Sequence, residues 1–201
     1  MLAFGAPRWR QAGQFTTVIQ KSPLFLSPAA GFDEPLDMLH ACHARVRRTL
    51  GLLARLGEHL AAQGLTAQAE QAIADVLRYF DVAAPLHHED EELHVFPLLR
   101  KTGHAALADA LQAEHVQMAG IWQQVRADLQ AWQAPDQEAA TATALPLMRA
   151  RWAHFIAFYS RHLQAEEAAA FPEAQRHLAP KARLLMGQDM ARRRGARYPE
   201  P

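Results

Sequence analysis

The most informative part of this chain is residues 87–97, which read His87-His88-Glu89-Asp90-Glu91-Glu92-Leu93-His94-Val95-Phe96-Pro97. Their pattern, H-x-x-x-E-E-x-x-x-F-P, returns in full at residues 162–172 as His162-Leu163-Gln164-Ala165-Glu166-Glu167-Ala168-Ala169-Ala170-Phe171-Pro172. On a helix, residues four apart lie on the same face one turn along, with Cβ atoms about 5 to 6 Å apart. His87 with Glu91, and His162 with Glu166, are therefore two matching pairs of an imidazole and a carboxylate.

One further histidine precedes each repeat. His43 lies in Leu39-His40-Ala41-Cys42-His43, and His115 follows Ala113-Glu114. The two are seventy-two residues apart, whereas the repeats are seventy-five apart, so the two halves match with a three-residue indel. The pattern predicts a duplicated helical hairpin in which each half carries a histidine on one helix and His-x-x-x-Glu on the next.

Composition narrows the class of protein. At 201 residues the chain is expected to form one domain. Its 21 basic and 21 acidic residues cancel, so no net field favours nucleic acid or a membrane surface. No apolar run approaches the roughly 18 residues that a membrane helix needs. With Cys42 as the single cysteine an internal disulfide is excluded, and a cytoplasmic protein is expected, with its oligomeric state left open.

The first helix of the bundle is expected between two clear signals. Residues 1–32 are punctuated by proline and glycine, which predicts an irregular extension along the outside of the bundle. Asp33 should cap the helix, with Pro35 in its first turn, where a missing N–H is harmless. Gly64 should end it. Apolar residues and one histidine recur between them at helical spacing: Leu36, Leu39, His43, Val46, Leu50 and Leu53.

The second helix should begin at Thr66, which can cap it, and run through the first repeat. Pro85 removes one backbone hydrogen bond and is expected to bend the helix one turn before His87. Phe96-Pro97 should end the helix, because the residue before a proline is biased out of the α region.

The second half of the chain repeats this plan. The third helix should span about residues 104–132, and in the fourth Pro146 predicts a break near Leu145. Four long helices with short links predict an all-α, up-down-up-down four-helix bundle over residues 33–172. Pro180 should open a short helix within residues 173–201, and the basic run Arg192 to Arg197 is expected to be a solvated tail rather than a nucleic-acid site.

Such a bundle would bury four imidazoles and two carboxylates in its interior. The charge of the carboxylates would need a positive partner, because each buried ion costs several kcal/mol. Two divalent cations about 3.5 to 4 Å apart, bridged by the carboxylates, would supply the positive charge. Each cation would receive two nitrogens and two oxygens, which leaves room for a small exogenous ligand. A nitrogen and oxygen donor set without thiolate suits iron and tolerates manganese or zinc. The six predicted metal residues are His43, His87, Glu91, His115, His162 and Glu166.

Less specific interpretations compete with this one. An isolated His-x-x-x-Glu pair is most often an ordinary ion pair, but the two upstream histidines at nearly equal spacing favour metal binding. His88 and Glu92 are also four apart and lie about 100° round the helix from His87 and Glu91. Alignment on Phe-Pro selects His87 and Glu91. His88, Glu92 and Glu167 are then expected on a solvated face or as partners of the ligands.

Over about residues 33–172 the chain resembles the hemerythrin-like proteins with the HHE cation-binding fold. The resemblance is carried by Cys42-His43, His87 to Pro97, Glu114-His115 and His162 to Pro172. It implies a left-twisted four-helix bundle around a non-haem di-iron centre that meets dioxygen, nitric oxide or peroxide. It also implies that the four histidines are terminal ligands and that the two glutamates, Glu91 and Glu166, bridge the irons.

Two departures from the oxygen-carrying members bear on function. Those proteins have a second histidine four residues after the first on the third helix, where this chain has Ala119. They also space histidine and aspartate by five on the fourth helix, where this chain has Glu167, although symmetry between the halves favours Glu166. Tyr159 lies one turn before His162 and could either pack in the core or hydrogen-bond a ligand at the metals.

The sequence therefore predicts a di-iron protein that binds or senses a diatomic ligand, O2 or NO, or handles iron under oxidative or nitrosative stress. A di-iron enzyme that reduces peroxide or nitric oxide is the alternative. A zinc-filled or metal-free helical scaffold that acts through a partner is a third. Motifs of other site classes, such as H-E-x-x-H, a glycine-rich phosphate loop and Gly-x-Ser-x-Gly, do not occur.

Overall fold

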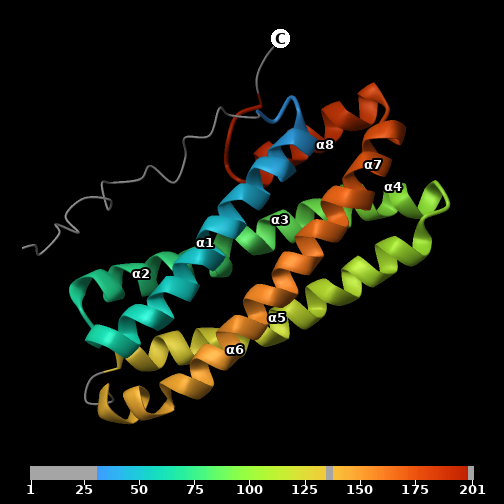
Figure 1. The fold of residues 1–201 in the computed structure, drawn as a ribbon. Helices are drawn as coiled ribbons and strands as arrows, with labels where there is room; N and C mark the ends of the chain where they lie inside the picture. Colours follow the sequence, from blue (N-terminus) through green and yellow to red (C-terminus); the bar gives the residue numbers. More distant parts are fainter. Residues whose placement is uncertain (1–30, 135–137, 199–201) are drawn as a thin grey trace, which may run out of the picture.

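The computed structural model describes residues 31–134 and 138–198, and all regular structure in these ranges is helical. The irregular extension predicted for residues 1–32 lies almost entirely outside the described residues. Each long helix runs antiparallel to the one before it, which confirms the predicted up-down-up-down bundle (Figure 1). The first and third long helices are α1 (Pro35–Gln63) and α5 (Ala105–Gln133). No helix of the described ranges is long and apolar enough to cross a membrane.

The second and fourth long helices are composite. The second joins α2 (Ala67–Arg78), η1 (Tyr79–Ala83), α3 (Ala84–Asp90), η2 (Glu91–Val95) and α4 (Phe96–Lys101). The fourth joins α6 (Glu138–Ala165), η3 (Glu166–Ala170) and α7 (Phe171–His177). The η segments are π turns, in which the backbone hydrogen bond spans five residues instead of four.

The predicted helix ends are only partly correct. Thr66 caps α2, because its hydroxyl accepts a hydrogen bond from the Ala69 N–H at 3.2 Å. Gly64 follows the last residue of α1 with φ of 69°, a conformation that glycine adopts without strain. Asp33 is not the cap of α1. That position belongs to Glu34, and its side chain makes no capping hydrogen bond.

The prediction that Phe96-Pro97 ends the second helix is wrong, because a π turn directly precedes this proline. At the end of η2 the N–H of Phe96 bonds to the Glu91 carbonyl, five residues back. The widened turn relieves the clash between the ring of Pro97 and the preceding turn of the helix, so the helix continues. The same arrangement precedes Pro85 after η1 and Pro172 after η3.

The break predicted near Leu145 is also wrong. Pro146 lies inside α6 without ending it. Leu145 and Met148 on either side of it are buried in the core. Their packing offsets the roughly 3 kcal/mol by which proline disfavours a helix interior.

Two apolar clusters hold the bundle together. The larger packs α1, α2, α5 and α6 around side chains such as Leu53, Ile73, Leu129 and Trp152. The smaller lies toward the other end of the bundle and includes Leu39, Phe96, Leu111 and Phe171. Along each long helix, buried polar residues separate the two clusters. The helices are therefore held by apolar packing on both sides of a polar layer.

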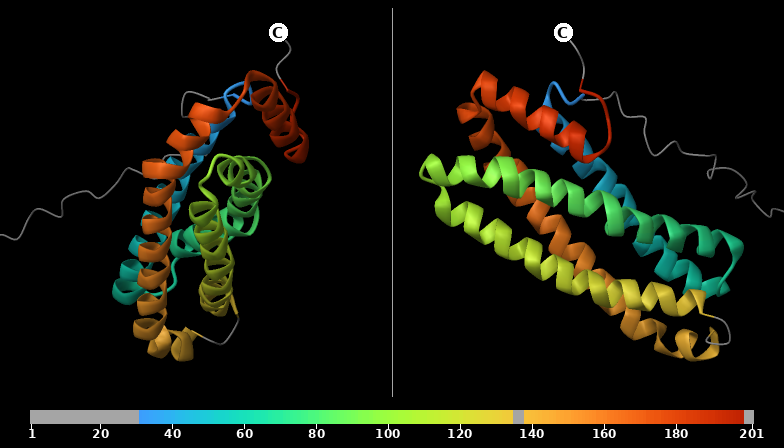
Figure 2. Two further views of the ribbon diagram at one scale, coloured as in Figure 1. Left: turned by 90° about the vertical axis from the view of Figure 1, so that its right-hand side faces the viewer. Right: turned by 180° about the vertical axis from the view of Figure 1, so that it is seen from behind.

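The C-terminal helix α8 (Pro180–Arg193) confirms the short helix predicted after Pro180 and lies across the end of the bundle (Figure 2). Its Met186 and Met190 join the smaller cluster. The basic run is not simply a solvated tail, because Arg193 and Arg194 form ion pairs with Asp90, a carboxylate that is fully buried. The C-terminal helix is thereby fixed to the residue that precedes Glu91.

Candidate metal centre

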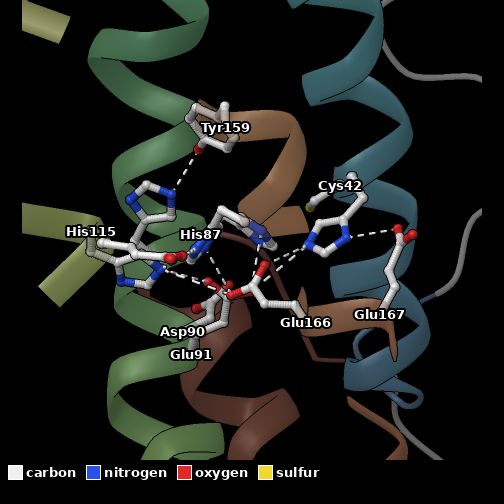
Figure 3. Close-up of polar contacts among 12 residues, drawn as sticks. Cys42, His87, Asp90, Glu91, His115, Tyr159, Glu166 and Glu167 are labelled. Atoms are coloured by element: carbon white, nitrogen blue, oxygen red, sulfur yellow. Dashed lines mark hydrogen bonds and ion pairs between the residues drawn. The ribbon is translucent and has the colours of Figure 1, made fainter. Parts of the chain in front are cut away.

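The polar layer between the two clusters contains all six predicted metal residues. Each long helix contributes one imidazole, and Glu91 and Glu166 are the first residues of the π turns η2 and η3. All six side chains are at most 4% exposed. Figure 3 shows His87, Glu91, His115 and Glu166 pointing toward one another between the helices. The residues that the sequence repeat singled out therefore lie together in the folded protein.

These residues form two groups, each with donor atoms within 4.8 Å of one another. Position A consists of His43 from α1, His87 from α3 and the two glutamates Glu91 and Glu166. Position B consists of His115 from α5, His162 from α6 and the same two glutamates. Each position thus offers two nitrogens and two oxygens, and both carboxylates are shared.

The Nε2 atoms of the four histidines converge on the shared carboxylates. The His87 Nε2 lies 3.3 Å from the nearer Glu91 oxygen, and the His162 Nε2 lies 3.1 Å from the nearer Glu166 oxygen. Across the bundle, the His43 Nε2 is 3.3 Å from the second Glu166 oxygen, and the His115 Nε2 is 3.5 Å from the second Glu91 oxygen. Each glutamate therefore faces one imidazole of each position, as a bridging carboxylate would.

The opposite ring nitrogens fix the orientation of three imidazoles. His43, His115 and His162 donate from Nδ1 to Glu167, Glu92 and Glu114, at 2.9, 2.8 and 2.8 Å respectively. An Nδ1–H directed at a carboxylate leaves the lone pair of a neutral imidazole on Nε2, where a metal would bind. Of the two positions predicted for Glu92 and Glu167, on a solvated face or beside the candidate ligands, the hydrogen bonds to His115 and His43 favour the second. Glu114 was missed, although it directly precedes His115 in the sequence.

The donor set is poorly satisfied by protein groups alone. Both oxygens of Glu91 and Glu166, the Nε2 of His43 and both ring nitrogens of His87 are buried without a hydrogen bond of acceptable geometry. The Nε2 atoms of His115 and His162 face each other at 3.2 Å. Buried polar atoms without partners are costly, and lone pairs that face each other repel. Two cations placed among these atoms would remove both problems, so the residues fit a two-metal centre.

The pKa values of the buried glutamates and of His87 are shifted, because these groups are buried close to one another. Burial and the nearby Glu166 raise the pKa of Glu91 well above its usual value. Burial also acts to raise the pKa of Glu166, but the imidazoles of His115, His162 and His43 outweigh it and hold this pKa well below the usual range. Burial lowers the pKa of His87 and keeps the ring neutral, the form in which an imidazole binds a metal.

An open cleft of about 430 Å³ reaches the centre beside position B. Apolar side chains including Phe80, Met118, Trp122 and Phe155 form most of its wall. Its polar lining residues are Asp81, His88, Glu89, Glu92, His115, Gln123 and Tyr159. The ring of His88 stacks on that of His115, with centroids 4.0 Å apart. A small molecule in the cleft would therefore meet an imidazole of position B.

Tyr159 and His88 have more specific surroundings than the sequence indicated. The Tyr159 hydroxyl lies 2.7 Å from the His88 Nε2 and hydrogen-bonds to it (Figure 3). Tyr159 is 1% exposed and also packs against Phe80 and Phe155, as expected of a core aromatic. Cys42 is buried, and burial raises the pKa of its thiol.

The fold and the site define a four-helix-bundle protein with buried clusters of histidine and glutamate that can hold metal ions. Residues 34–174 match the hemerythrin HHE cation binding domain, and the chain belongs to this family. A relative from Haemophilus influenzae, described as an uncharacterized protein, is 31% identical over 167 residues. The match covers 82% of this chain and 92% of that protein.

Proposed function

We propose that this protein holds two non-haem iron ions and uses them to bind or sense a small diatomic ligand, O2 or NO. The observation that carries this proposal is the pair of four-residue groups that share Glu91 and Glu166. We assign His43 and His87 to one iron, His115 and His162 to the other, and both glutamates to a bridge between them. Iron in such a centre would supply an open coordination position and a change of oxidation state.

The cleft supports a small exogenous ligand. Its walls are largely apolar, which suits uncharged gas molecules, and His115 is one of its polar lining residues. The hydrogen-bonded pair of His88 and Tyr159 also lines the cleft and offers a polar contact. Handling of iron under oxidative or nitrosative stress uses the same residues. Peroxide or nitric oxide reduction at this centre is the enzymatic alternative.

Metal content is the first test. Protein prepared with ample iron should contain two iron ions per chain and absorb in the near ultraviolet and visible. Removal of the metal by a chelator should leave the helical circular dichroism intact, because the two apolar clusters hold the helices. It should lower the melting temperature by about 5 to 10 °C, because a ligand at 100 times its Kd stabilises the folded state by about 2.7 kcal/mol.

A variant with His154→Ala is the matched control for this experiment, because His154 is an exposed histidine on α6. It should keep both iron ions, whereas His87→Ala should not. Protein that contains zinc, or no metal at all, would favour the scaffold interpretation instead. Reduced protein exposed to oxygen then separates carrier from enzyme: a persistent charge-transfer band favours binding, and rapid bleaching with peroxide turnover favours catalysis.

Blocking the cleft tests the route of the ligand. Ala119 lines the cleft on α5, and Ala119→Phe should fill part of it. We expect stopped-flow association of NO with the reduced protein to slow at least tenfold while iron content is unchanged. Ala113→Phe, at an exposed position of α5, is the control and should bind NO at the normal rate. Equal rates in both variants would exclude the cleft as the entry route.

A further inference from the structure

The two metal positions have different surroundings, although the sequence repeat makes their ligands equivalent. In each half, a glutamate that follows the bridging carboxylate holds a histidine: Glu92 holds His115 and Glu167 holds His43. The two halves differ at the other two histidines, His162 and His87. Glu114, which precedes His115, accepts the Nδ1–H of His162. The matching residue, which precedes His43, is Cys42.

His87 is consequently the exception among the four imidazoles. Its Nδ1 is buried and has no hydrogen-bond partner within the described part of the chain, whereas the other three rings each have a carboxylate there. A carboxylate that accepts this hydrogen bond fixes the ring and makes the opposite nitrogen a stronger donor. Position A therefore has one imidazole with this support, and position B has two.

The supporting carboxylates also differ in charge. Arg47 binds both oxygens of Glu167, at 2.8 and 2.6 Å. The charge of Glu167 is thus largely cancelled by a guanidinium close to position A. Among the described residues, neither Glu92 nor Glu114 forms an ion pair with lysine or arginine. Within the described residues, two carboxylates without a lysine or arginine partner therefore support position B, whereas the carboxylate that supports position A is paired with Arg47.

We propose that position B, formed by His115 and His162, binds its cation first and at least tenfold more tightly than position A, so that a stable form with one metal exists. This proposal rests on the proposed two-metal function and adds the order of loading to it. The magnitude follows from the tenfold to hundredfold loss of affinity that accompanies removal of a single such partner. The open cleft reaches the more tightly held cation, because His115 belongs to position B.

Titration of the metal-free full-length chain with Co²⁺, followed by calorimetry and by the visible cobalt bands, tests the order. Two cations that share two carboxylates repel each other, so two separate steps alone are not diagnostic. The identity of the first position is diagnostic. His162→Ala should remove the tight step, whereas His87→Ala should remove the weak step and leave one tightly bound Co²⁺ per chain.

Changes in the supporting residues test the cause. Glu114→Gln should weaken the first step about tenfold or more, because it removes the charge but keeps an acceptor. Arg47→Gln should strengthen the second step, because it frees the charge of Glu167. Arg48→Gln is the control, since Arg48 is an exposed neighbour on α1, and should alter neither step.

Three results would overturn the order of loading. These are equal affinities at the two positions, loss of the tight step in the His87→Ala variant, or no effect of Glu114→Gln on the first step. If the unaltered chain bound no Co²⁺ and no iron, the two-metal function itself would be wrong. Failure of the order and failure of the function are therefore distinguishable.

Discussion

Protein carrying Glu166→Gln should be purified with almost no bound metal. Glu166 faces both positions, with one oxygen 3.3 Å from the His43 Nε2 and the other 3.1 Å from the His162 Nε2. Loss of its charge removes an anionic donor from each cation at once. Replacing a residue that only supports a ligand already costs roughly 10- to 100-fold in affinity. A bridging ligand should cost more, and metal analysis after gel filtration measures the loss.

The same substitution should also lower the stability of the metal-free protein. Glu166 is fully buried, and the imidazoles of His115, His162 and His43 hold its pKa well below the usual value. A carboxylate whose pKa is lowered in the folded state stabilises that state at neutral pH, and Gln at position 166 removes this contribution. We expect the metal-free variant to unfold at a lower temperature than the metal-free parent. Glu89→Gln, at an exposed position, should keep both metals. Two metals retained by Glu166→Gln would contradict the bridging role.

Asp90→Ala should cause the largest loss of stability. Asp90 is fully buried, and the side chains of Arg193 and Arg194, which pair with it, are only 10% and 17% exposed. Removing one partner of a buried ion pair leaves the other charges uncompensated and costs about 3 to 5 kcal/mol. For a chain of this size, that corresponds to a melting temperature lower by roughly 6 to 20 °C.

Metal-free protein should be used for this comparison, because Asp90 is adjacent to Glu91 and a change in metal content would confuse the result. Asp75→Ala is the control. Asp75 pairs with Arg78 at the surface, and loss of such a pair costs less than about 1 kcal/mol. An equal effect of the two substitutions would show that the contact of α8 with Asp90 contributes little to folding.

The repeat made the centre predictable, because it combined a helical period with donor residues. A four-residue interval places His87 and Glu91 on one helix face whatever the tertiary structure is. The partners of the ligands were harder to predict, since they join different helices. Glu114 reaches His162 across the bundle, and nothing in the local sequence around Glu114 indicates this contact. Arg193 and Asp90 are likewise 103 residues apart in the sequence.

The proline errors have a different physical origin. The rule that proline ends a helix assumes an α turn before it, with a carbonyl that the ring would meet. At Pro97 and Pro172 that turn is a π turn, which widens the helix. Both of these turns begin at a shared glutamate, Glu91 or Glu166. π turns occur often at functional sites. A helix that continues through a proline shortly after a buried carboxylate therefore indicates a functional site.

Joining the two hairpins in one polypeptide has a consequence for evolution of the centre. Two identical hairpins that associated as a dimer around a twofold axis would have to surround both cations with the same side chains. A substitution that improved the surroundings of one cation would also change the surroundings of the other. The single chain removes this constraint, so different residues, Cys42 and Glu114, can occupy equivalent positions of the two hairpins. The residues around each cation can then evolve separately.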